Sequence, residues 1–183
     1  RVEEGIYPAH IASLTTKDVN TKAGQAIVVN MTYKVADEVA DQNQLMWEMD
    51  GFKYVLDENK EKIPVMNGSG KQKEESCDHL LGRTFYDNGW FVFTTAQSSS
   101  KNERYFQLLD KLGIDCKEQK VEGKKVKKLV LIEDEDVIGK PVLVDVKRQS
   151  YITKETRDLP ADQQERRNIF RVTNLSPWHE GKG

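Results

Sequence analysis

The clearest indication of the fold is Ile27-Val28-Val29-Asn30-Met31-Thr32-Tyr33-Lys34-Val35. Every second side chain in it is large and apolar, and most of those between are polar. Alternation of this kind, rich in β-branched residues, predicts a strand with one buried face and one wetter face. Residues 5–11 alternate in the same way and predict a partner strand. Because Pro8 lacks an N–H, that strand should lie at an edge or carry a bulge.

Residues 36–82 follow the strand predicted at 27–35 and have a different composition. Residues 36–62 hold eight acids against three bases, a net charge of −5. Residues 67–71 read as a flexible tip, while Trp47 and Tyr54 indicate some core. We therefore expect an insertion into a β domain, covering residues 36–75 and extending toward 82. Its charge predicts that it faces away from any phosphate path, or covers that path as a movable lid.

Beyond the insertion, residues 83–93 predict a hairpin that turns at Asp87-Asn88-Gly89, because Asn-Gly supplies positive φ angles. An apolar stripe over residues 105–112 predicts a helix, with Ser100 and Glu103 as a capping box and Gly113 as its end. A second hairpin should turn at Glu122-Gly123 and return through residues 126–132. Strands are expected at 142–147 and 169–175, with a polar loop at 153–165.

These elements predict a single mostly β domain over residues 1–183. Six or seven short strands, two tight hairpins and one helix between the third and fourth strand groups indicate a small antiparallel barrel of the OB type. Topology alone does not assign a function to it.

Composition narrows the class of protein further. The 183 residues carry 28 Lys and Arg against 30 Asp and Glu, a net charge of −2, which leaves room for a basic groove on an acidic surface. Two cysteines exclude a disulfide-dense scaffold and favour a reducing, cytoplasmic setting. No apolar run approaches the ~20 residues that a membrane helix needs.

Basic and aromatic residues alternate on the predicted strands, as a surface for single-stranded nucleic acid requires. Cations there follow the phosphates while bases stack on rings, at ~1–3 kcal/mol per stacked base. The candidate binding residues are Lys22, Lys34, Arg83, Tyr86, Trp90, Lys147, Arg148, Tyr151, Arg167 and Arg171. The competing interpretation is that the rings belong to the core and the cations to a solvated face.

A second basic cluster surrounds the second hairpin and would extend a nucleic-acid path or protect an edge strand from aggregation. Its members are Lys117, Lys120, Lys124, Lys125, Lys127 and Lys128.

Two catalytic or metal-binding patterns are weaker. Asp145-Val146-Lys147, with Asp134 or Asp136 as a further acid, is typical of half of a metal-dependent nuclease site. Cys77, His79, Cys116 and His179 could supply four zinc ligands but lack the paired spacing of such sites. Core cysteines and surface histidines explain them better.

Several short motifs resemble single-stranded-DNA-binding proteins of bacteriophages, which are OB-fold proteins of replication and recombination modules. The motifs are Gly5-Ile6-Tyr7-Pro8-Ala9, Lys22-Ala23-Gly24-Gln25-Ala26-Ile27-Val28-Val29, Leu112-Gly113-Ile114, Ile138-Gly139-Lys140-Pro141-Val142-Leu143-Val144 and Arg167-Asn168-Ile169-Phe170-Arg171-Val172. The resemblance covers most of the chain outside residues 36–82.

The resemblance implies sequence-independent coating of single strands, without catalysis, cofactor or metal. It also implies a place in the host cytoplasm and phage replication or recombination proteins as partners. Many such proteins end in an acidic tail that recruits partners, whereas residues 178–183 are not acidic, so the tail is either lacking or trimmed. The alternative is a virion or assembly protein whose β domain carries no DNA groove.

Overall fold

The computed structural model describes residues 2–51, 53–94, 100–116, 118–121, 123–127 and 129–179. A six-stranded sheet forms most of it, in the order β1-β11-β12-β7-β2-β8. These strands are β1 (Gly5–Thr21), β2 (Gly24–Val35), β7 (Thr84–Asp87), β8 (Trp90–Phe93), β11 (Pro141–Ile152) and β12 (Arg166–Pro177).

The sheet closes into a five-stranded barrel because β1 pairs with both β11 and β2. Gly5 lies opposite Val146 at one end of β1, and Thr21 lies opposite Gly24 at the other. The pair of β12 with β7 is parallel, and the other pairs are antiparallel. The predicted OB-type barrel is confirmed. Pro8, for which we predicted an edge strand or a bulge, precedes the first residue of β1 that pairs with β2, Ala9. The register of that pairing shifts further along β1, between Ile11 and Ser13.

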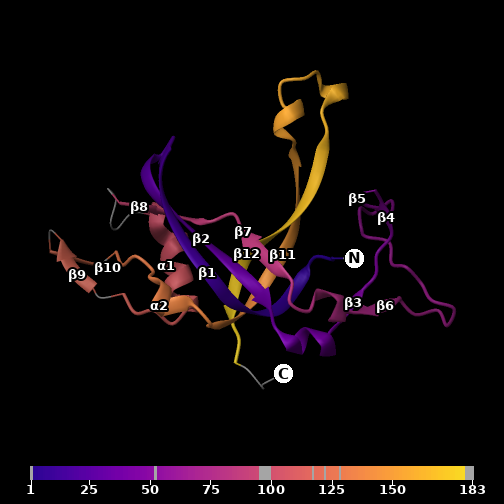
Figure 1. Ribbon diagram of the computed structural model, residues 1–183, viewed down its shortest axis with the longest axis horizontal. Helices are drawn as coiled ribbons and strands as arrows, with labels where there is room; N and C mark the ends of the chain where they lie inside the picture. Colours follow the sequence, from indigo (N-terminus) through magenta and orange to yellow (C-terminus); the bar gives the residue numbers. More distant parts are fainter. Residues whose placement is uncertain are drawn as a thin grey trace.

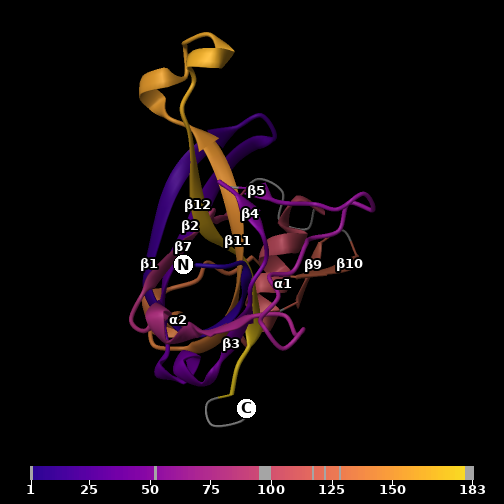
Figure 2. The same cartoon turned by 90° about the vertical axis from the view of Figure 1, so that its right-hand side faces the viewer.

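Two hairpins extend beyond the barrel as arms on the same side of the molecule (Figures 1 and 2). The first arm is the β1–β2 hairpin, with its turn at Lys22 and Ala23. The second arm is the end of the β11–β12 hairpin beyond Lys147. In the sheet order β7 lies between these two hairpins, so the arms flank the outer face of β7.

The predicted hairpin at residues 83–93 is wrong. β7 and β8 do not pair with each other; both pair with β2, one after the other. Tyr86 lies opposite Thr32 and Trp90 opposite Val29, so the chain carries one extra residue in between. Asp87-Asn88-Gly89 is therefore a β-bulge in one interrupted strand, with Gly89 at φ 88°.

The predicted helix is confirmed as α1 (Glu103–Lys111), which follows the short turn η3 (Ser100–Asn102). Asn102 stands at its start, where it accepts a hydrogen bond from the Phe93 N–H at 2.8 Å and donates one to the Phe93 carbonyl at 3.0 Å. The Ser100 side chain lies outside the described part of the chain. Tyr105, Leu108 and Leu109 of α1 are buried in the barrel core. Gly113, at φ 71°, ends the helix as predicted.

The second hairpin also forms, from β9 (Glu118–Val121) and β10 (Lys124–Lys127). Its return strand ends well before Ile132, where we expected it to continue. The short helix α2 (Asp134–Val137) follows and was not predicted.

The insertion contributes no strand to the barrel within the described residues. It contains η1 (Asp37–Asp41), β3 (Asn43–Leu45), β4 (Met49–Asp50), β5 (Lys53–Tyr54), β6 (Glu74–Ser76) and η2 (Cys77–Leu80). β3 pairs with β6, and β4 with β5, in two small separate sheets. Val39, Cys77 and Leu80 join the main core, so both ends of the insertion are anchored.

Candidate nucleic-acid interface

Strand register brings five side chains from five strands into one line across the outer face of the barrel. Lys147 lies opposite Arg171, Arg171 opposite Tyr86, Tyr86 opposite Thr32, and Thr32 opposite Ser13. We call Ser13, Thr32, Tyr86, Arg171 and Lys147 the cross-strand row. Three of its five members were predicted site residues, although they lie far apart in the sequence.

Tyr86 and Arg171 form the centre of the cross-strand row. The Tyr86 side chain is 53% exposed, and the Arg171 guanidinium carbon lies 5.9 Å from the centre of its ring. Arg171 Nη1 also donates to the Asp87 carbonyl at 3.5 Å. A cation held beside an exposed ring can contact a phosphate while the ring accepts a base.

Lys34 extends this surface by one step along β2, since it lies opposite Thr84 of β7 and His10 of β1. Its side chain is exposed. Arg83, just before β7, is exposed as well, and its guanidinium carbon lies 5.5 Å from the centre of the buried Phe85 ring. Lys34 therefore lies beside the cross-strand row. Arg83 lies on the side of Phe85 and not on that of Tyr86, because side chains alternate along a strand.

Trp90 was predicted to stack on bases, but it is a core residue with 3% exposure. The exposed aromatic of β8 is its neighbour Phe91, which is 41% exposed and was not predicted. Phe91 lies opposite Val28, and Val28 lies opposite Lys17 of β1. We therefore replace Trp90 by Phe91, with Lys17 nearby, on the candidate surface.

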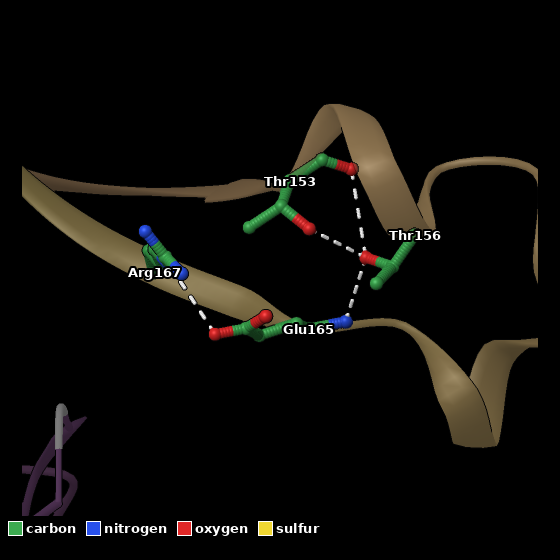
Figure 3. Close-up of polar contacts among 4 residues, drawn as sticks. All are labelled: Thr153, Thr156, Glu165 and Arg167. Atoms are coloured by element: carbon green, nitrogen blue, oxygen red, sulfur yellow. Dashed lines mark hydrogen bonds and ion pairs between the residues drawn. The ribbon is translucent and has the colours of Figure 1, made fainter.

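The second arm carries two more predicted residues. Tyr151, 46% exposed, lies opposite Arg167, two pairs along the same face from Lys147 and Arg171. The Arg167 side chain forms an ion pair with Glu165 at 3.2 Å (Figure 3). Lys147 has a looser ion pair with Asp145, at 3.8 Å. At the tip of the first arm, Lys22 is exposed and distant in register from the cross-strand row.

The tip of the second arm, predicted as a loop, is a compact cap made of η4 (Lys154–Thr156) and η5 (Ala161–Gln163). The Thr156 hydroxyl joins the two sides of the cap: it accepts from the Glu165 N–H at 2.9 Å and lies 2.7 Å from the Thr153 hydroxyl (Figure 3). Thr153 itself is buried. The tip of the second arm is therefore an ordered structure that supports the side chains of its two strands.

Arg148 points away from this surface, to the opposite side of the second arm. Its guanidinium carbon lies 5.2 Å from the Tyr54 ring centre and 5.3 Å from that of Phe170. Tyr54 in turn donates to the Glu3 carboxylate at 3.2 Å. Arg148 thus links the insertion to the arm, and the acidic insertion packs on the side opposite to Lys147 and Tyr151.

A buried carboxylate fixes the bulge beneath Tyr86. Asp87 accepts hydrogen bonds from the Tyr33 hydroxyl at 2.7 Å and the Gly89 N–H at 3.0 Å. It also accepts from the Met31 N–H at 3.1 Å and the Asn30 amide at 3.2 Å. Burial raises the pKa of the Asp87 carboxyl above its ordinary value, and the bond from Tyr33 is the first of those that oppose this rise.

We expect Tyr33→Phe to raise the pKa of Asp87 further, because the substitution removes a hydrogen bond that favours the ionised form. In the wild type, the native state already holds this proton more tightly than the unfolded chain does. The stabilising contribution of this group is therefore full at low pH and is lost as pH rises through the native pKa. Carboxyl NMR titration of both proteins measures the shift, and a lower pKa in Tyr33→Phe would contradict this account.

The second basic cluster is only partly described. Lys117 and Lys128 lie outside the described residues, and so do the side chains of Lys120, Lys124, Lys125 and Lys127.

The residues suggested for metal chemistry lie in separate places. Cys77 is buried beside Gln44, Cys116 is half-buried, and Asp134 and Asp136 are exposed on α2. Across the described ranges, no three His, Cys, Asp or Glu side chains are grouped so that they could hold a metal ion. Nor does any helix in those ranges have the length and apolar character needed to cross a membrane.

Comparisons of this chain with protein families, with curated proteins and with solved structures return no match.

Proposed function

We propose that this protein binds single-stranded DNA without reading its sequence, along the outer face of β2, β7 and β12. The observation that carries the proposal is the cross-strand row, where Arg171 is held beside the exposed ring of Tyr86 and Lys147 adjoins them. Phe91 and Tyr151 add exposed rings on either side. Rings for bases and cations for phosphates are the two components that such binding needs.

The position of this surface in the fold supports the same function. OB barrels bind oligonucleotides on the face of their second and third strands and with the loops that join strands one to two and four to five. In this barrel those parts are β2 with β7–β8, the first arm and the second arm. The acidic insertion lies on the other side of the second arm, where it does not oppose phosphates.

The biological setting that we propose is coating and protection of single strands during phage DNA replication or recombination, in the host cytoplasm. The short sequence motifs that resemble phage proteins support this setting. Replication or recombination proteins of the phage would then be the protein partners.

Titration of a labelled oligonucleotide at two salt concentrations tests the proposal. Four phosphate contacts, from Lys17, Lys34, Lys147 and Arg171, predict about 50-fold weaker binding at roughly 200 mM than at 50 mM salt. Random-sequence and homopolymer strands should bind alike, and duplex DNA more weakly. A virion or assembly protein would show no binding and no salt dependence, and metal-dependent cleavage of the strand would favour the nuclease.

Tyr86→Ala should weaken binding of single strands by ~1–3 kcal/mol, because one base loses its stacking partner. Tyr86→Phe keeps the ring and should bind almost as the wild type does. Since Tyr86 is exposed, neither change should alter the free energy of unfolding by more than ~0.5 kcal/mol. Equal affinities for Tyr86→Ala and the wild type would remove this ring from the binding surface.

A further inference from the structure

Two irregularities open the barrel wall at one place. The bulge at Asp87-Asn88-Gly89 turns β8 away from β12 directly after the last β7–β12 pair, Val172 with Asp87. The pairing of β12 with β11 shifts in register directly after Val172 as well. Thr173 is the extra residue of β12 there, between Val172 and Asn174. Helix α1 packs over this opening, with contacts to both β8 and β12.

A cavity of about 210 Å³ remains between α1 and β12. The helix presents Arg104, Gln107 and Lys111 to it, side chains that share one helix face. Thr173 and Asn174 of β12 line the other side, and Trp90 and Leu108 form the apolar floor. The lining is polar and cationic and includes no carboxylate.

Both cations are held in place by neutral groups. Arg104 donates to the Thr173 carbonyl at 3.3 Å, and its guanidinium carbon lies 5.5 Å from the Trp90 ring centre. Lys111 donates to the Asn174 side-chain oxygen. Within the described ranges neither cation forms an ion pair with a carboxylate, so among these residues their positive charges have no acidic partner in contact.

We propose that this cavity binds a phosphate group, and that in the complex this group is a backbone phosphate of the bound single strand. Arg104 and Lys111 supply the charge, and Gln107 and Thr173 supply neutral hydrogen bonds. Arg171 lies two residues before Thr173 on β12, about 7 Å along the strand, so the cavity continues the path that begins at the cross-strand row. The nucleic-acid part of this inference rests on the proposed function.

The test compares Arg104→Gln/Lys111→Gln with Lys53→Gln/Lys71→Gln, a control that removes the same charge from exposed sites on the insertion. The cavity variant should bind a single-stranded oligonucleotide about tenfold more weakly than the wild type, as expected for loss of charged hydrogen bonds. Its salt slope should fall by about 0.7 units, which corresponds to one phosphate. The control should keep the affinity and slope of the wild type.

Inorganic phosphate, added to the wild type without DNA, should shift the amide NMR signals of Gln107, Thr173 and Asn174, and should not do so in the cavity variant. If the wild type binds DNA and the cavity variant equals the control, the inference is overturned while the proposed function stands. If the wild type binds no DNA but shows the phosphate shifts, the proposed function fails and the cavity is a site for free phosphate. If neither ligand has an effect, both are wrong.

Discussion

Gly89→Ala should lower the free energy of unfolding by more than ~3 kcal/mol, enough to reduce the melting temperature by roughly 10 °C. A Cβ at this position would lie 2.5 Å from Val28 Cγ2, 2.8 Å from Asn30 Nδ2 and 3.3 Å from the Val29 carbonyl oxygen. The φ angle of 88° adds backbone strain of about 1–2 kcal/mol for any residue with a side chain. Thermal and denaturant unfolding measure the loss.

Gly70→Ala is the matched control for this substitution. Gly70 also has a positive φ, 78°, but a Cβ there would meet no atom within 4 Å. The difference between the two variants isolates the crowding at the bulge from the dihedral strain that both share. Equal destabilisation by both would show that Val28 and Asn30 yield at little cost, and that the bulge does not require Gly89 for space.

Trp90→Ala should cost about 3–5 kcal/mol of stability, the range for removal of a large buried aromatic side chain. The indole ring is buried between the barrel interior and α1, and Arg104 lies against it. Trp90→Phe should cost less because it fills most of the space. Denaturant titration gives the free energies, with unchanged m-values as the sign of an intact native state.

The same Trp90 variants decide whether the ring takes any direct part in binding. At temperatures where Trp90→Phe is fully folded, its affinity for single strands should match that of the wild type. Trp90 also supports Arg104 at the proposed phosphate cavity, so this result is interpreted together with the cavity variant. Ten-fold weaker binding by folded Trp90→Phe, with wild-type binding by Arg104→Gln/Lys111→Gln, would mean that the indole ring itself reaches the nucleic acid and belongs to the binding surface.

Much of the barrel could be predicted from sequence because its signals are local. In residues 27–35 every second side chain is large and apolar, and β2 has no bulge in its pairing with β7 or β8. The stripe that ends at Gly113 produced a helix at the predicted place. The position of α1 between the third and fourth strands of the barrel then limited the topology to few choices.

The interrupted strand β7–β8 shows where local signals fail. Asp87-Asn88-Gly89 suits a tight hairpin turn as well as a bulge, because both need a residue with positive φ. The choice depends on groups that are remote in sequence: the Tyr33 hydroxyl and the Met31 N–H bond to Asp87, and β2 pairs with both halves. Nothing within residues 83–93 reveals those partners.

The error at the candidate site follows directly from that bulge. In an unbroken strand, Tyr86 and Trp90 would point to the same face, since side chains alternate with a period of two. One extra residue exchanges the faces, which buries Trp90 and exposes Phe91. Conversely, Lys147 and Arg171 were correctly placed on strands, Lys147 exposed and Arg171 half-buried. Only the register shows that Tyr86 lies next to Arg171.

The closure of the barrel by β1 has a consequence for synthesis of the chain. Residues 5–10 of β1 pair with residues 141–146 of β11, which are synthesised more than 130 positions later. The barrel therefore cannot close until β11 has left the ribosome. Pairing over such separations is slow because the loop entropy must be lost first. Until then, the nascent β1–β2 hairpin has an unpaired edge and exposes the apolar faces of Tyr7, Ala9 and Ile11. This interval is when the chain is most open to aggregation or to capture by a chaperone.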